Sequence, residues 1–140
     1  LITLTLWGNE IGDAGAAAIA EGLSVNRVLT TLYLGDNHIG PTGATAIGKA
    51  LEVNRALNML WLNSNNIGDT GAAAIGEALK GNRAMNLLDL QSNKIGDAGM
   101  QAFADTIRSG ALGSLVTLRL HRNRIGDDVR PNMCGVWAIA

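Results

Sequence analysis

The sequence is poor in cysteine, in glycosylation sites and in long apolar runs, and each shortage excludes a class of protein. Its 140 residues include one cysteine, Cys134, which has no partner for a disulfide within the chain, so nothing in it requires an oxidising compartment. No Asn-x-Ser/Thr acceptor for N-glycosylation occurs. The apolar runs are far shorter than the ~20 residues that span a membrane, and the first residues lack the basic-then-apolar pattern of a signal peptide. We therefore expect a soluble, cytoplasmic protein without a membrane partner.

An excess of charge of either sign is also missing. The chain has 11 Lys and Arg residues against 12 Asp and Glu, a net charge of -1. This balance argues against a general nucleic-acid or membrane-surface binder. Hydrophobic residues make up 47% and charged residues 16%, which favours a folded chain over a disordered one. The length fits a single domain, 1–140.

What the sequence does contain is an internal repeat, marked by an asparagine that recurs every 28 residues and, at the last interval, after 30. An Ile-Gly pair follows each asparagine, and Leu-x-x-Leu-x-Leu (with Met in place of the first Leu once) precedes it. The asparagines are Asn9, Asn37, Asn65, Asn93 and Asn123. This spacing predicts units 1–28, 29–56, 57–84 and 85–114, with an irregular last unit, 115–140.

Each unit combines two periodicities. The Leu-x-Leu segment alternates with period 2, which predicts a short strand with one buried face. In the alanine-rich segment that follows, residues such as Ala72, Ile75 and Leu79 recur at helical spacing. A strand–helix unit cannot bury its apolar face alone, so we expect the units to stack into an α/β solenoid, with parallel strands on a concave face and helices on a convex face.

Polar residues at the unit boundaries have predicted structural roles. The recurring asparagine is expected to bond the backbone at the turn after each strand. Aspartates that precede the helices suit N-capping, and asparagines that follow the helices suit a left-handed terminating turn. The aspartates are Asp13, Asp69, Asp97 and Asp127, and the second set of asparagines is Asn26, Asn54 and Asn82. Small residues such as Ala16, Ala44, Ala72, Gly48 and Gly76 should let the helices approach closely.

The pattern Leu-x-x-Leu-x-Leu-x-x-Asn-x-Ile-Gly in a 28-residue unit resembles the leucine-rich repeat of the ribonuclease-inhibitor type. Unit 57–84, with its Gly-Ala-x-Ala-Ile and Asn-Arg, is most similar to the repeats of the NOD-like receptors. The resemblance implies a horseshoe whose inner sheet surface binds protein. Members of the family cap both ends with polar repeats, whereas this chain opens on Leu1 and closes with the apolar Val136, Trp137 and Ile139. We therefore expect a segment of a longer array, or an array whose exposed ends form a homodimer.

The residues between the strand leucines should face the concave side. The candidate protein-binding residues are Trp7, Tyr33, Trp61, Met59, Leu87, Asp89, Arg119 and His121. Three of the five aromatic residues of the chain thus fall on neighbouring strands. Because Trp, Tyr and Arg dominate interface energetics, we predict a binding hot spot; cross-strand packing for stability is the alternative. For the arginines of the last unit, an ordinary solvated end fits equally well.

Apparent catalytic motifs are better explained by the repeat. Residues 43–49 match Gly-x-x-x-x-Gly-Lys of a phosphate-binding loop, but Ala50 follows where Ser or Thr would hold magnesium. His38 and His121 lie three units apart, too far to share a metal. Cys134 stands in the irregular last unit with no residue in sequence to orient it. We therefore expect no enzyme, no cofactor and no metal.

The leading hypothesis is a non-catalytic module that binds a protein partner on its concave sheet surface. We expect no small-molecule substrate, and we do not expect nucleic acid as a partner because only the C-terminal arginines favour it. One alternative is a regulator of a small GTPase, because the Ran GTPase-activating proteins use a similar repeat, although no acting residue of theirs is matched here. The other is self-association through the ends of the stack.

Overall fold

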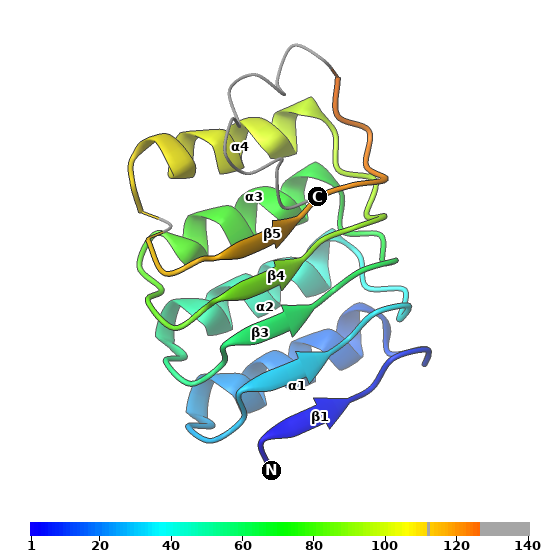
Figure 1. Ribbon diagram of the computed structural model, residues 1–140. Coiled ribbons are helices and arrows are strands. Elements are labelled where there is room, and N and C mark those ends of the chain that lie inside the picture. Colours follow the sequence, from blue (N-terminus) through cyan, green and yellow to red (C-terminus); the bar gives the residue numbers. More distant parts are fainter. Residues whose placement is uncertain (112, 127–140) are drawn as a thin grey trace.

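The computed structural model describes residues 1–111 and 113–126, in which short strands alternate with helices (Figure 1). The strands are β1 (Thr3–Thr5), β2 (Thr31–Tyr33), β3 (Met59–Trp61), β4 (Leu87–Asp89) and β5 (Thr117–Arg119). The helices are α1 (Gly12–Val25), α2 (Pro41–Val53), α3 (Gly68–Leu79) and α4 (Asp97–Arg108). Each element lies where its periodicity predicts it, because a period of 2 buries one face of a strand and a period of 3.6 buries one face of a helix.

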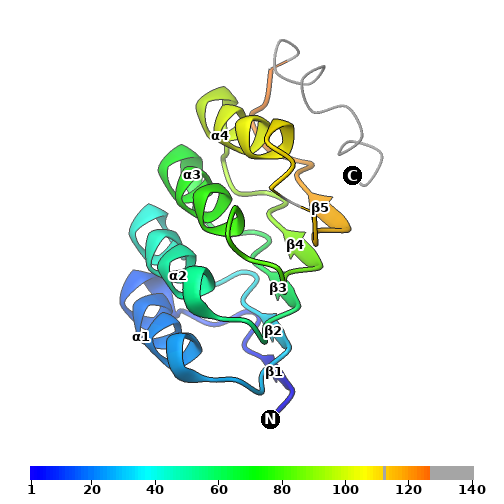
Figure 2. The ribbon, with the colours of Figure 1, turned by 90° about the vertical axis from the view of Figure 1, so that its left-hand side faces the viewer.

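The strands form one parallel sheet in chain order, β1-β2-β3-β4-β5. The pairing joins equivalent positions of successive units, so that Leu4, Leu32, Leu60, Leu88 and Leu118 stand in one row. The turned view shows the strands lining one side of the stack and the helices the other (Figure 2). The predicted leucine-rich solenoid is therefore confirmed, and we call its strand-lined surface the strand face.

The core lies between the two layers and consists of the repeated apolar positions. The second and third leucines of the strand motif are buried in the middle units, as is the isoleucine of each Ile-Gly pair there. The fully buried residues include Leu32, Leu34, Ile39, Leu60, Leu62, Ile67, Leu88, Leu90 and Ile95. Every unit thus buries its apolar positions against the next, which is the reason the units fold only as a stack.

Small residues bring the helices together. Ala16, Ala44 and Ala72 are fully buried on successive helices. A Cβ atom on Gly48 would lie 3.1 Å from the carbonyl oxygen of Ala74 on the neighbouring helix. A larger residue at position 48 would therefore push α2 away from α3.

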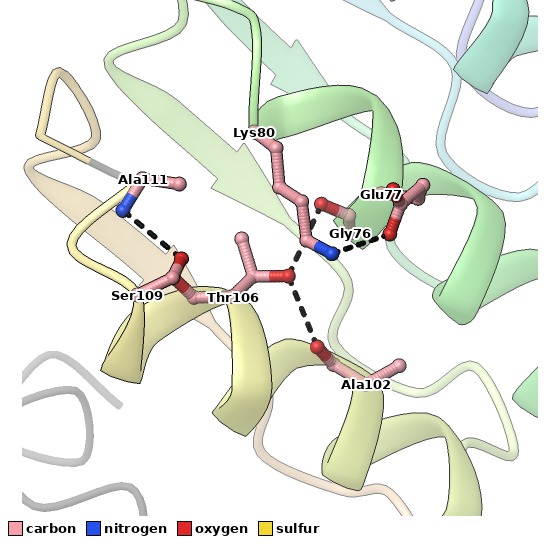
Figure 3. A network of polar contacts seen from close by, with 7 residues as sticks. All are labelled: Gly76, Glu77, Lys80, Ala102, Thr106, Ser109 and Ala111. Carbon is pink, nitrogen blue, oxygen red and sulfur yellow. Dashed lines mark hydrogen bonds and ion pairs between the residues drawn. The ribbon is translucent and has the colours of Figure 1, made fainter.

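One buried polar side chain, Thr106, lies at the contact between α3 and α4 (Figure 3). Its hydroxyl donates to the carbonyl oxygen of Ala102 at 3.0 Å, and the carbonyl oxygen of Gly76 on α3 lies at 3.5 Å. The group is therefore satisfied within its own helix, as burial of a hydroxyl requires. Close by, Glu77 of α3 and Lys80, which follows the helix, form an ion pair of 2.7 Å.

Part of the predicted last unit lies outside the described residues, including Asp127, Cys134, Val136, Trp137 and Ile139. Within residues 1–111 and 113–126, none of the helices has the length and apolar character needed to cross a membrane.

Candidate functional site: the strand face

The strand face brings together part of the predicted binding set. Tyr33 of β2 pairs in register with Trp61 of β3, and their rings stack with centroids 5.5 Å apart and planes inclined by 16°. Both side chains are half-buried. A stacked pair of this kind combines a large apolar surface with two polar edges, which suits it to an interface.

The other apolar members surround this pair. Trp7 is 59% exposed and Met59 is 38% exposed, while Leu87 is half-buried beside Met59 on the next strand. Trp7 does not join the ring stack; it lies over Gly35, where a Cβ atom would come within 2.6 Å of its Cδ1 atom. The absence of a side chain at Gly35 therefore makes room for Trp7 on the strand face.

Asp89 is a correction to the predicted set, because it is buried, with 2% of its surface exposed. Its Oδ1 accepts a hydrogen bond from the backbone N–H of Gln91 at 2.9 Å. Its Oδ2 lies 3.6 Å from Nη1 of Arg119 on the next strand. Asp89 therefore holds Arg119 in place and is not available to contact a partner.

Arg119 extends the aromatic stack. Its Cζ atom lies 5.0 Å from the centroid of the Trp61 ring, a distance at which a guanidinium is attracted to the ring face. Tyr33, Trp61 and Arg119 thus form a continuous layered group that extends from β2 to β5, and Asp89 on the intervening β4 pairs with Arg119.

Two polar atoms of the strand face have no hydrogen-bond partner within the described part of the chain. They are Nε1 of Trp61 and Nδ1 of His121, and both atoms are buried. Such groups are uncommon in folded proteins and call for an explanation. Sequence patterns do not reveal such unpaired atoms, because the burial and hydrogen bonding of a side-chain atom depend on how neighbouring side chains pack.

The recurring asparagines form a hydrogen-bonded column at the turns after the strands. Oδ1 of Asn65 accepts from the backbone N–H groups of Asn37 and Ile39, both at 3.0 Å. Its Nδ2 donates to the carbonyl oxygens of Leu34 at 2.9 Å and Leu62 at 3.0 Å. Equivalent bonds occur at Asn9, Asn37, Asn93 and Asn123. These side chains form hydrogen bonds with backbone groups in the turns, where the hydrogen bonding between strands has ended.

A second asparagine column, at the opposite end of the units, replaces the predicted left-handed helix ends. Asn26 and Asn54 have extended backbones, with φ of −74° and −75°. Oδ1 of Asn54 accepts from the N–H groups of Ala56 and Leu57, and its Nδ2 donates to the carbonyl oxygen of Leu23 in the preceding unit at 2.7 Å. Asn82 repeats this arrangement. The prediction of left-handed caps was wrong because these side chains bond between units.

The predicted N-cap aspartates also act between units. The N-cap residues of α1, α3 and α4 make no capping hydrogen bond with their own side chains. Instead, Oδ1 of Asp69 accepts from the N–H groups of Gly96 at 2.6 Å and Gly99 at 3.1 Å, at the start of α4. Asp13 bonds Gly40 and Gly43 at the start of α2 in the same way. Asp13 and Asp69 therefore cap the helix of the following unit, and Asp97 accepts from the N–H group of Gly126 in the next unit at 2.6 Å.

Pro41 interrupts this series and changes the next turn. It occupies the position of Asp13 and Asp69 in the second unit, so this unit has no aspartate at the position from which the others cap the following helix. Gly68 at the start of α3 has φ of +65°, whereas Gly96, which is bonded to Asp69, has φ of −101°. The backbone at the helix start thus takes an extended form where the preceding unit supplies an aspartate.

We expect Asp69→Ala to weaken the start of α4 rather than that of α3. The loss of an N-cap acceptor costs about 1–2 kcal/mol. Amide hydrogen exchange should therefore accelerate at Gly96 and Gly99, as measured by NMR. Asp69→Asn keeps the Oδ1 acceptor and should preserve most of the protection. Faster exchange confined to α3 would contradict the capping between units.

Among the described residues, no group of three or more His, Cys, Asp or Glu side chains is placed to hold a metal ion.

The comparisons with known proteins agree with this architecture. Residues 1–20, 25–48, 53–76 and 81–104 match the family model described as Leucine Rich repeat. These segments make up more than half of the chain, which therefore belongs to the leucine-rich repeat family. A search of curated protein sequences finds no match.

Two solved structures illustrate the likeness. Leiomodin-1 Actin-Binding Site 2 superposes with a TM-score of 0.83 at 21% identity, and the match covers 97% of this chain and 78% of that one. The C-terminal domain of tropomodulin from Caenorhabditis elegans gives a TM-score of 0.77 at 13% identity, covering 99% and 83%. At these identities, the likeness shows a shared fold.

Proposed function

We propose that the chain is a non-catalytic module that binds a protein partner on its strand face. The observation that carries this proposal is the stack of Tyr33 on β2, Trp61 on β3 and Arg119 on β5, whose side chain reaches across β4, with Trp7 and Met59 exposed on the same face. Trp, Tyr and Arg are the residues that contribute most to protein interfaces. The parallel strands that carry them hold these side chains in fixed register, so the side chains lose little conformational entropy on binding.

The exposure of Trp7 and Met59 favours a binding role over a purely structural one. A cross-strand cluster that only stabilised the sheet would gain by being covered, yet Trp7 and Met59 remain open to solvent. Exposed apolar groups that gather on one surface mark interaction sites. The proposed role therefore explains why apolar residues stand in strand positions that elsewhere hold threonine, such as Thr3 and Thr5.

The segment 43–49 does not have the structure of a phosphate-binding loop. Gly43 and Gly48 of the phosphate-loop-like segment lie inside α2 and are buried between helices. Their backbone is thus used in the helix, whereas a phosphate-binding loop presents its N–H groups before the helix begins.

We propose that the protein acts in the cytoplasm. We also propose that its repeats are of the ribonuclease-inhibitor type, with 28-residue units similar to those of the NOD-like receptors. The unit length and the Asn-x-Ile-Gly motif support the subtype. A single cysteine and the absence of N-glycosylation acceptors support the compartment.

Actin is the first candidate partner. The structure of leiomodin-1 that shares this fold is named for an actin-binding site. The match covers 97% of this chain, so the shared fold extends over the strands that form the strand face.

Site-directed photo-crosslinking tests the proposal. Benzoylphenylalanine is placed at position 59 on β3 or, as a matched control, at position 53 at the end of α2, where Val53 is also exposed. After irradiation in a lysate of the source cells, mass spectrometry identifies the crosslinked protein. We expect a partner, with actin as the candidate, joined at position 59 and not at position 53. Crosslinking from position 53 alone, or to a second copy of the chain, would contradict binding of a protein partner on the strand face.

A further inference from the structure

Charge is separated along the turns that follow the strands, at the edge of the strand face. Glu10 and Asp36 are exposed after β1 and β2. Lys94, Arg122 and Arg124 are exposed after β4 and β5. Asp36 and Arg122 occupy the same position of their units, and so do Glu10, Lys94 and Arg124. The two ends of one continuous edge therefore carry opposite charge.

The basic end has charge available for a ligand. Asp89 is occupied by Arg119 and by the N–H group of Gln91. Within the described residues, the ion pairs involve neither Lys94 nor Arg122 nor Arg124. Nδ1 of His121, next to Arg122 in sequence, is buried without a hydrogen-bond partner there. In the part of the chain that the structure describes, three cations without an ion-pair partner and an unsatisfied ring nitrogen thus lie at β4 and β5 or in the turns after them.

The aromatic stack and this basic end are separate but close. Trp61 lies on β3 and Arg122 follows β5, two strands further along the sheet (Figure 1). At ~4.8 Å per strand, the separation across the strands is about 10 Å. Arg122 also lies beyond Arg119, which stands in the same row as Trp61. An extended peptide advances ~3.3 Å per residue, so about three residues cover the separation across the strands.

Resting on the proposed function, we propose that the partner presents an acidic segment to the strand face. An aromatic or large aliphatic side chain of the segment packs on Tyr33, Trp61 and Met59. Carboxylates about three residues away from it lie at Lys94 and Arg122. The segment runs across the strands, with its acidic end toward β5.

A nucleic acid fits this surface less well, although aromatic and basic groups also bind single strands. A nucleic acid carries negative charge along its whole length. Glu10 and Asp36, beside Trp7 and Tyr33, would repel such a chain at the aromatic end. A peptide whose charge is confined to one end meets no such repulsion.

The test is selection from a phage library of random dodecapeptides on the immobilised chain, followed by fluorescence anisotropy of an enriched peptide. We expect enriched sequences with an aromatic or large aliphatic residue and Asp or Glu about three positions away. The Lys94→Glu/Arg122→Glu variant should bind such a peptide at least about tenfold more weakly. As a matched control, Arg55→Glu/Arg83→Glu reverses two exposed charges in the loops before β3 and β4, and its affinity should change less than about twofold.

Several results would overturn the inference. These are enriched peptides without acidic residues, the absence of any enriched peptide, equal binding by the two charge variants, and tighter binding of a 12-nucleotide oligouridylate than of the peptide. The Tyr33→Ala/Trp61→Ala variant distinguishes the two proposals. If it loses the peptide while the charge reversal has no effect, the strand face is the site but the partner is not acidic. If it retains the peptide, the proposed function fails as well.

Discussion

Asn65→Ala should lower the free energy of unfolding by about 3–5 kcal/mol. The side chain is 8% exposed and makes hydrogen bonds with backbone groups of its own unit and of the preceding one. Its removal leaves the N–H groups of Asn37 and Ile39 without the acceptor that both share. It also takes the Nδ2 donor away from the carbonyl oxygens of Leu34 and Leu62.

The size of this effect follows from the number of groups affected. Each buried backbone group left unpaired costs about 1–3 kcal/mol, and the substitution leaves two N–H donors unpaired. The carbonyl oxygens of Leu34 and Leu62 each keep a second donor, Nδ2 of Asn37 and Nδ2 of Asn93 respectively. A domain of this size is stable by about 5–15 kcal/mol in all, so the loss is a large fraction of the total. Urea denaturation followed by circular dichroism measures it from the shift of the midpoint.

The adjacent residue provides the control. Asn66 is exposed, and its backbone N–H, which bonds to Ile39, is retained in an alanine variant. Asn66→Ala should therefore change the free energy of unfolding by less than about 0.5 kcal/mol. Similar losses at positions 65 and 66 would show that the asparagine column does not support the turns.

The strands and helices of this fold can be predicted from the sequence because the same patterns recur in successive units. The alternation at Leu60 and Leu62 and the helical spacing of Ala72, Ile75 and Leu79 are local signals. They identify the buried face of each element without knowledge of its neighbours. The stacking order follows, because units of equal length can bury these faces only against one another.

Contacts between units were predicted less well, and Asp69 shows the reason. Its place at the start of a helix indicates an N-cap, yet its carboxylate bonds Gly96 and Gly99 of the next unit. A periodic sequence identifies equivalent positions. It does not reveal whether a short polar side chain reaches into its own unit or into the neighbouring one. Asn54 was misread for the same reason.

The repeat pattern also could not predict which side chains of the candidate site are buried. Strand alternation assigns Asp89 to the same face as Trp61 and Arg119, and the pairing has all three in register. The burial of Asp89 arises because the long side chain of Arg119 reaches back across it to Trp61. Such coverage depends on side-chain rotamers, which the positions in a repeat do not determine.

The central claim is that the stacked pair Tyr33–Trp61 carries the binding energy for a protein partner. Tyr33→Ala/Trp61→Ala removes both rings and, with them, the surface over which Arg119 lies. Truncating hot-spot residues of this kind costs more than about 2 kcal/mol in binding, which corresponds to about a thirtyfold weaker affinity. The buried core residues of these strands, such as Leu32 and Leu60, are unchanged, so the variant should keep its helical circular dichroism spectrum.

The measurement is the affinity of three forms of the chain for the partner identified by crosslinking, determined by calorimetric titration. The control, Val25→Ala/Val53→Ala, truncates two exposed apolar residues at the ends of α1 and α2, away from the strand face. We predict that the wild type and this control bind with the same affinity, and that folded Tyr33→Ala/Trp61→Ala binds at least about thirtyfold more weakly. Equal affinity of all three forms would contradict a binding site on the strand face.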